Sequence, residues 1–187
     1  MLKNDLRRAY LDKRAQLSDE ECERISSEVA ERLFSEIDFN KVRAVHIFLP
    51  IERFNEIDTW PIIYRLWTQF PHVQTFAPRM SEDGGDMSSI EITKTTQIVS
   101  GRWDVPEPSA GPEIDASEID VVIVPLLCAD EDGFRVGYGK GFYDRFLSKC
   151  RPDCRKIGLS HFPPVEKIDD VGEWDVRLDK VMGGGRE

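Results

Sequence analysis

The feature that most constrains the fold is the hydrophobic run Asp120–Pro125, which reads DVVIVP. Its four central residues are all valine or isoleucine, so a strand here has no polar face and must be covered on both sides. Strands of this kind are typical of parallel sheets that carry helices above and below. We therefore predict that residues 1–187 form a single-domain α/β fold, with a mostly parallel sheet flanked by helices on both faces (a three-layer α/β/α arrangement).

Apolar residues recurring at three or four positions indicate several amphipathic helices. Ser18 and Glu21 match a capping box, in which each side chain satisfies a free backbone amide of the other residue. Thr59 is predicted to cap the third helix. The predicted helices cover residues 2–17, 18–37, 59–70 and Phe142–Cys150.

Short runs of β-branched and apolar residues between these helices predict further strands. The run Val73–Ala77 is predicted to end at Pro78, and Val105–Ala116, with three prolines, is predicted to be an extended loop. In α/β folds, ligands bind beyond the carboxyl ends of the strands, which here lie after Leu49 and Pro125. The other predicted strands are Val42–Leu49, Ile90–Thr93, Ile98–Val99, Lys156–Ser160 and Val176–Met182.

The charge of the chain is strongly acidic overall but unevenly distributed. A net charge of −10 argues against nucleic-acid binding, which needs a basic surface. Residues 134–156, however, hold seven basic and two acidic side chains, a local charge of +5. A second basic cluster opens the chain. These residues could be solvated helix faces, or two patches that converge on a small polyanion; the second cluster is Lys3, Arg7, Arg8, Lys13 and Arg14.

The remaining composition points to an ordinary cytoplasmic protein. No apolar run approaches the ~20 residues that a membrane span needs. The N-terminus is basic but has no apolar stretch behind it, so it does not resemble a secretory signal. The four cysteines form no CxxC pair and the three histidines are scattered, so we expect reduced thiols without a metal or redox role.

The segment with the clearest chemistry is Gly133–Asp144, GFRVGYGKGFYD, between the strong strand and a helix. Its alternating glycines let backbone amides approach a bulky anion, and the helix that follows presents its amide end to the same place. Arg135 and Lys140 add full positive charges. The run lacks the spacing of a P-loop and of the dinucleotide-binding motif. It predicts a phosphate site, the alternative being a flexible turn.

The run RVGYGKGFYD, followed by RFL, resembles the signature of the 5-formyltetrahydrofolate cyclo-ligase family. Other pieces of the family pattern occur in the same order along nearly the whole chain. They are Lys3–Arg7, FLPIERFNEIDT at Phe48–Thr59, Trp103–Pro108, the approach DVVIVPLLCADEDG and the acidic Glu173–Asp175. The resemblance implies an ATP- and Mg²⁺-dependent enzyme that converts 5-formyltetrahydrofolate to 5,10-methenyltetrahydrofolate, releasing ADP and phosphate.

The resemblance also implies roles for individual residues. Lys3 and Arg7 would bind ATP phosphates, and Arg135 and Lys140 would act in catalysis as well as in phosphate binding. Asp144 would hold Mg²⁺ directly or through water. The family often has histidine where this chain has Trp174, so Asp175 would act on the metal only indirectly. The full nucleotide set is Lys3, Arg7, Arg135, Gly137, Tyr138, Gly139, Lys140, Gly141, Phe142 and Tyr143.

The folate would be bound by Glu56, through a hydrogen-bonding edge of the pterin. Leu49, Trp103, Tyr138 and Phe142 would line its pocket, although core packing is the ordinary role of such apolar residues. Two other interpretations stay open: a related enzyme with another nucleotide or formylated substrate, and a nucleotide-binding regulatory module without catalysis. We expect a monomer whose partners are small molecules, without nucleic acid or membrane.

Overall fold

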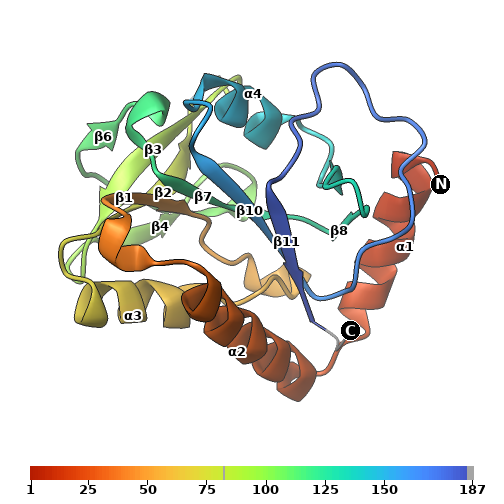
Figure 1. The fold of residues 1–187 in the computed structure, drawn as a ribbon, viewed down its shortest axis with the longest axis horizontal. Helices are drawn as coiled ribbons and strands as arrows, with labels where there is room; N and C mark the ends of the chain where they lie inside the picture. Colours follow the sequence, from red (N-terminus) through yellow and green to blue (C-terminus); the bar gives the residue numbers. More distant parts are fainter. Residues whose placement is uncertain (82, 185–187) are drawn as a thin grey trace.

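The computed structural model describes residues 1–81 and 83–184. Its centre is a seven-stranded sheet with the strand order β11-β10-β7-β1-β2-β3-β6 (Figure 1). The first five strands in that order run parallel, and β3 is antiparallel to both of its neighbours, β2 and β6. The mostly parallel sheet predicted from the sequence is confirmed. The strands are β1 Ala44–Ile47, β2 Gln74–Met80, β3 Met87–Ile92, β6 Glu113–Ile114, β7 Val121–Pro125, β10 Arg155–Ser160 and β11 Lys180–Gly183.

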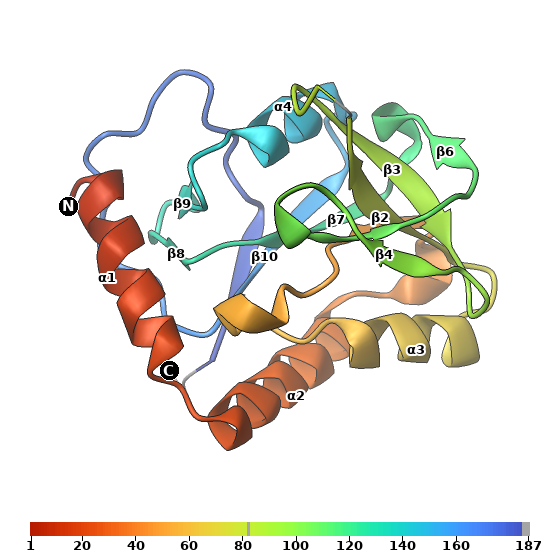
Figure 2. The same ribbon diagram turned by 180° about the vertical axis from the view of Figure 1, so that it is seen from behind.

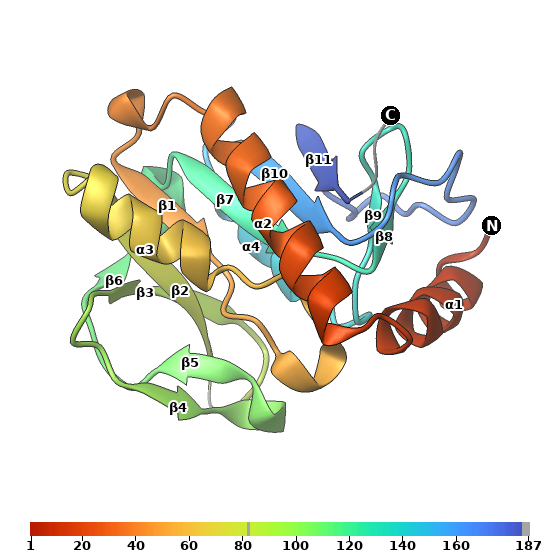
Figure 3. The same cartoon turned by 90° about the horizontal axis from the view of Figure 1, so that it is seen from below.

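Helices cover both faces of this sheet. The helices α2 (Asp19–Glu36) and α3 (Trp60–Gln69) pack on one face, and α4 (Phe142–Lys149) packs on the other (Figure 3). Strand β7 shows why: Val121 and Ile123 belong to the core under α2 and α3, whereas Val122 and Val124 belong to the core under α4. The three-layer arrangement predicted from DVVIVP is therefore present.

The helix α1 (Lys3–Ala15) lies beside the sheet rather than on either face (Figure 2). Its buried Leu6 and Tyr10 pack against a small hairpin formed by β8 (Cys128–Ala129) and β9 (Arg135–Val136). A second hairpin, β4 (Ile98–Ser100) with β5 (Pro106–Pro108), extends beyond the antiparallel side of the sheet. These three pieces are additions to the α/β core, and all of them reach the site described below.

The helix ends follow the capping signals in part. Ser18 and Glu21 form the predicted capping box at the start of α2. Thr59 is the N-cap residue of α3, as predicted, but its hydroxyl does not bond the helix amides and donates instead to the carbonyl of Phe48 at 2.7 Å. The amide of Trp60 is satisfied by Asp58 instead, at 3.0 Å.

Two predictions about prolines were wrong. Strand β2 continues through Pro78 to Met80, because it pairs with β1 only over Gln74–Phe76. Beyond Phe76, one edge of β2 pairs with no other strand, and a residue without an N–H is tolerated there. The predicted loop Val105–Ala116 contains β5 and β6, each of which pairs with a strand on one side.

None of the helices in the described part of the chain is both long and apolar enough to cross a bilayer. All four cysteines carry free thiols, as expected.

Candidate active site

A cavity of about 570 Å³ opens where β1, β2 and β7 end, the edge at which parallel strands place ligands. Every residue that the sequence predicted for the site lines this one cavity, although these residues come from segments far apart in the chain. They are Lys3, Arg7, Leu49, Glu56, Trp103, Arg135, Gly137, Tyr138, Gly139, Lys140, Gly141, Phe142, Tyr143, Asp144 and Asp175.

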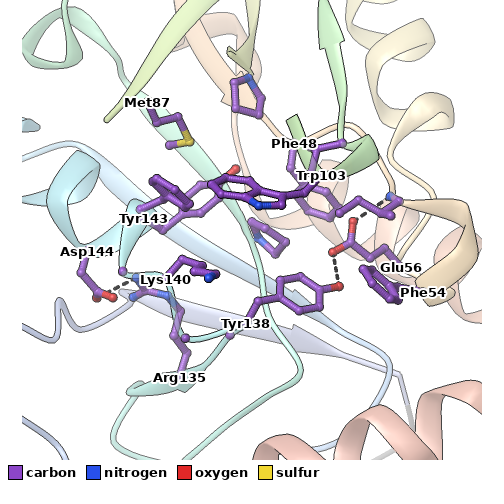
Figure 4. A pocket seen from close by; sticks show the side chains of 18 of the residues that line it. Phe48, Phe54, Glu56, Met87, Trp103, Arg135, Tyr138, Lys140, Tyr143 and Asp144 are labelled. Atoms are coloured by element: carbon purple, nitrogen blue, oxygen red, sulfur yellow. Dashed lines mark hydrogen bonds and ion pairs between the residues drawn. The ribbon is translucent and has the colours of Figure 1, made fainter. Parts of the chain in front are cut away.

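The cavity has two chemically different ends (Figure 4). The ion pair of Arg135 and Asp144 lies at one end and Glu56 lies at the other, with Tyr138 and Trp103 between them. Of the charged side chains in the lining, five are basic and three are acidic, which leaves +2 inside a protein of net charge −10. The basic residues of the lining are Lys3, Arg7, Arg53, Arg135 and Lys140.

The glycine loop adopts conformations that need glycine. Gly139 has φ +84° and Gly141 has φ +69°, values that other residues adopt only with strain. Gly141 is also the N-cap of α4, whose first turn of free amides therefore faces the loop. A Cβ on Gly139 would lie 3.2 Å from the guanidinium of Arg7. Arg7 in turn donates from Nε to the carbonyl of Gly137 at 2.9 Å, which ties α1 to the loop.

Arg135 is the most enclosed cation of the cavity, with its side chain 6% exposed. One arm of its guanidinium donates to Asp144 Oδ1 at 2.7 Å and the other to the carbonyl of Val176 at 2.7 Å. Burial lowers the pKa of Arg135, and the neighbouring Asp144 carboxylate opposes that effect. Lys140 differs, because among the described residues its ammonium group forms no ion pair. Lys140 is therefore the more available charge.

The two predicted metal-binding carboxylates are each held by a cation. Asp144 also accepts from the amide of Val176, while Asp175 pairs with Lys3 and accepts from the amide of Gly172. In the part of the chain that the structure describes, no three acidic, histidine or cysteine side chains form a metal-binding group. Asp144 Oδ2 and Asp175 Oδ1 make no hydrogen bond to a described residue. Such a pair fits Mg²⁺ that arrives with phosphates, since Mg²⁺ typically takes one or two carboxylates plus phosphate oxygens and water.

Glu56 is a buried carboxylate fixed at both oxygens. Oε2 accepts from the amide of Ile51 at 2.8 Å, and Oε1 accepts from the hydroxyl of Tyr138 at 2.6 Å (Figure 4). Burial raises the pKa of Glu56, while the bonds from Tyr138 and Ile51 and the charge of Arg14 act in the opposite direction. The Tyr138 pKa is raised as well, first by burial and then by Glu56, so Tyr138 stays a hydrogen-bond donor.

Aromatic rings cover the middle of the cavity. The rings of Trp103 and Phe142 are 5.8 Å apart, and the ammonium of Lys140 lies 5.7 Å from the Trp103 ring. Phe54 packs on Tyr138 with ring centroids 5.4 Å apart. Trp103 and its neighbour Asp104 both have left-handed backbones, at φ 57° and φ 53°. Non-glycine residues in this region are strained, and such strain is concentrated at functional sites.

The lining also contains residues that the sequence analysis did not assign. Arg53 and Phe54 lie inside the quoted segment FLPIERFNEIDT, so their motif was a usable signal. Met80 was missed because strand β2 was expected to stop at Pro78, and Met87 because the next strand was expected to begin only at Ile90. The unassigned residues are Phe48, Ile51, Arg53, Phe54, Pro78, Met80, Met87, Val105 and Pro125.

The fold and the cavity together define an α/β protein in which a basic glycine loop at the carboxyl edge of a parallel sheet faces an aromatic pocket with a buried carboxylate. The sequence matches the family model for the 5-formyltetrahydrofolate cyclo-ligase family over residues 1–184. The chain belongs to this family.

Individual relatives agree with that assignment. The chain is 29% identical over 175 residues to a 5-formyltetrahydrofolate cyclo-ligase of Escherichia coli strain K12, covering 91% of this chain and 93% of the relative. It is 26% identical over 187 residues to the mouse 5-formyltetrahydrofolate cyclo-ligase, covering 94% and 90%. The NMR structure of Aquifex aeolicus 5,10-methenyltetrahydrofolate synthetase superimposes with a TM-score of 0.82 at 29% identity, covering 98% of this chain and 90% of the other.

Proposed function

We propose that this protein catalyses the ATP-dependent cyclisation of 5-formyltetrahydrofolate to 5,10-methenyltetrahydrofolate, with release of ADP and phosphate. The observation that carries the proposal is the single cavity in which a basic glycine loop faces Glu56 across aromatic side chains. The family membership supports the same activity.

The glycine loop is the proposed binding site for the ATP phosphates. The amides at the start of α4 and the ammonium of Lys140 offer donors to an anion, and Arg7 already contacts the loop. Lys3 joins this group from the first turn of α1. Both guanidinium arms of Arg135 already donate hydrogen bonds, one to Asp144 and one to the carbonyl of Val176. We therefore propose that Arg135 orients these two groups while its charge faces the phosphates.

Asp144 is the proposed ligand of Mg²⁺, and Asp175 supports it. When bound with ATP, the ion would neutralise phosphate charge. Lys3 and Arg135 now occupy one oxygen of each carboxylate, which leaves the other oxygen for the metal or its water. This donor set is incomplete without phosphate oxygens, so we expect metal binding to depend on the nucleotide.

Glu56 is the proposed anchor of the folate. A carboxylate held at both oxygens accepts further hydrogen bonds in a defined direction, which suits the N–H groups on one edge of a pterin. Trp103, Tyr138 and Phe142 provide rings against which a flat heterocycle can stack. The formyl group would then lie between this anchor and the phosphate loop.

The proposed reaction needs positioning more than a protein nucleophile. The formyl oxygen attacks the γ-phosphorus of ATP and ADP leaves, so the weakly electrophilic formamide carbon becomes an activated imidate. The folate N10 attacks that carbon and loses its proton, and the bond from carbon to the phosphorylated oxygen breaks to release phosphate. The side chains of the loop stabilise the negative charge that develops on the phosphoryl group, the usual basis of catalysis in phosphoryl transfer.

All four thiols are free, which fits a reducing compartment, and we propose that the protein is cytoplasmic. We also propose that it acts as a monomer on small molecules.

The test of this function is absorbance at the methenyl-folate band, with purified protein, 5-formyltetrahydrofolate, Mg²⁺ and ATP. The band should grow only when ATP is present. A flat trace from folded protein that still binds ATP would instead favour another formylated substrate or a regulatory module without catalysis.

Replacing Glu56 by glutamine tests the folate side separately. The glutamine side chain of this variant offers an amide donor where a carboxylate oxygen is needed, so the KM for 5-formyltetrahydrofolate should rise about tenfold or more, with ATP binding unchanged. Calorimetric titration with a nonhydrolysable ATP analogue measures the second quantity. Loss of ATP binding in this variant would show that Glu56 is assigned to the wrong substrate.

A further inference from the structure

Arg14 is a buried cation that does not line the cavity. Leu6, Tyr10 and Arg14 follow one another at intervals of four residues and therefore share one face of α1. Arg14 is only 3% exposed. Among the described residues it forms no ion pair within 4 Å. A buried charge without a compensating partner is strongly unfavourable, so its neighbours must explain why it is there.

The side chain of Tyr138 connects Arg14 with the cavity. Nη2 of Arg14 donates to the hydroxyl of Tyr138, and that hydroxyl donates to Glu56 at 2.6 Å. The guanidinium carbon lies 5.6 Å from the Tyr138 ring centre, and Nε has no hydrogen-bond partner among the described residues. The charge of Arg14 is therefore matched by Glu56, with the Tyr138 hydroxyl between them.

The backbone reinforces this arrangement. Asn55, next to Glu56, has a left-handed backbone at φ 47° and donates from Nδ2 to the carbonyl of Arg14 at 3.1 Å. The carbonyl of Asn55 lies 2.8 Å from Nε2 of His161. The end of α1 is thus attached to the residue that precedes the carboxylate.

We propose that Arg14 is a positioning residue of the folate end: through Tyr138 it supplies the positive charge that keeps Glu56 ionised and aimed at the substrate, without touching the substrate itself. This inference rests on the proposed function for the role of Glu56. The chain of hydrogen bonds from Arg14 through Tyr138 to Glu56, called the relay below, is a property of the free protein. It also gives α1 two tasks, because Lys3 and Arg7 reach the phosphate end and Arg14 reaches the folate end.

Several groups besides Arg14 face Glu56 and act on its ionisation. Tyr138 and the Ile51 amide donate hydrogen bonds to it directly. The pKa of Tyr143 on α4 is raised first by burial and then by the charge of Glu56. Burial is the largest influence and favours the neutral acid, which is the tendency that Arg14 opposes. His161 after β10 is a further titratable neighbour. The same cavity also contains the cations Lys3, Arg7, Arg53, Arg135 and Lys140, with Arg135 at the end away from Glu56.

The experiment titrates Glu56 in the free protein by ¹³C NMR of its carboxyl carbon, assigned with the Glu56→Gln variant. Arg14→Met removes the charge but keeps an apolar stem, Arg14→Lys keeps a charge, and Arg8→Met is the matched control on the exposed face of α1. We expect Arg14→Met to raise the Glu56 midpoint by about one pH unit, Arg14→Lys to restore most of it, and Arg8→Met to leave it unchanged.

The second readout is the KM for 5-formyltetrahydrofolate against the KM for ATP as the pH is lowered. In Arg14→Met the folate KM should begin to rise at a higher pH than in wild type, by about tenfold per pH unit below the new midpoint. The ATP KM should not follow. A Glu56 midpoint equal to that of wild type would overturn the relay. A shifted midpoint with an unchanged folate KM would overturn the positioning role, and an inactive wild type would refute the proposed function while the NMR titration still decides the relay.

Discussion

At the scale of single residues, Arg135 joins two parts of the site. Its guanidinium holds Asp144 from α4 and the carbonyl of Val176 from the C-terminal segment. We expect Arg135→Ala to lower kcat/KM about a hundredfold or more, because a charge aimed at the phosphates is lost. The same change leaves the partly buried carboxylate of Asp144 without its ion-pair partner, so the free energy of unfolding should fall by about 1 to 3 kcal/mol. Steady-state kinetics below the melting range, with denaturant unfolding, measures both.

The matched control for Arg135 is Lys149→Ala, which removes an exposed ion pair between Lys149 on α4 and Asp86, the residue before β3. Exposed pairs of this type contribute little, so its activity and stability should stay near wild type. An Arg135→Ala protein with wild-type kcat/KM would remove Arg135 from the catalytic groups.

His46 predicts a pH dependence of stability. It is fully buried on β1, its Nδ1 lies 2.7 Å from the Ser89 hydroxyl, and burial lowers its pKa to about 3. The unfolded chain protonates this residue near pH 6.5, whereas the folded chain does not. The stabilising contribution is therefore complete above about pH 6.5 and is lost as the pH falls toward 3, with a slope of up to about 1.4 kcal/mol per pH unit.

Replacing His46 by Gln should flatten that slope, even if the variant is less stable at neutral pH. His161, whose pKa burial lowers to about 4, gives the remaining dependence of the same sign. Urea unfolding at several pH values compares the slopes with those of wild type and of the exposed-site control His72→Gln. Equal slopes in wild type and His46→Gln would show that His46 titrates alike in both states.

Single residues differ in how well their roles could be predicted from the sequence. Fifteen residues of the cavity were predicted, because their motif is continuous around the glycine loop and because the resemblance covers the outlying segments. Arg14 was counted only within a basic cluster, although its spacing from Leu6 and Tyr10 placed it on the buried face of α1. His46 was missed because a lone histidine in an apolar strand carries no pattern of its own.

At the scale of elements, the glycine loop ties backbone conformation to ligand binding. Gly139→Ala forces a side chain into a left-handed conformation and against Arg7, so it should destabilise the protein by about 1 kcal/mol and weaken ATP binding. Gly137 has no such conformation, and a Cβ there meets no atom within 4 Å. Gly137→Ala should therefore leave the melting temperature unchanged. Thermal unfolding distinguishes the pair, and equal losses would contradict the conformational argument.

Elements were predicted best where burial alone decides them. DVVIVP has one physical solution, a strand covered on both faces, and β7 adopts it. Elements stabilised only by neighbours distant in sequence were not predictable. Pro78 and the prolines of β5 argue against strands locally, but each lies where one side of its strand has no partner, and that depends on the register of the sheet.

At the scale of the whole molecule, a cavity of charge +2 opens in a protein of net charge −10. Anionic substrates are repelled by the net negative charge of the protein and attracted by the positive charges of the cavity. Salt weakens the attraction from the solvent-exposed charges of the cavity more than the attraction from its buried charges. We expect the KM for ATP to rise several-fold between about 0.05 M and about 0.5 M salt, with kcat little changed. Sucrose at equal osmolality is the control, and a KM independent of salt would show that these charges do not guide binding.

The β4–β5 hairpin carries Trp103 into the cavity. In the described part of the chain its two strands pair with each other and not with the central sheet. Residues can be inserted into or deleted from this hairpin without shifting the register of any parallel strand. The segment around Trp103 is therefore the part of the cavity that evolution, or a protein engineer, can remodel for another heterocycle while the sheet that positions the glycine loop stays intact.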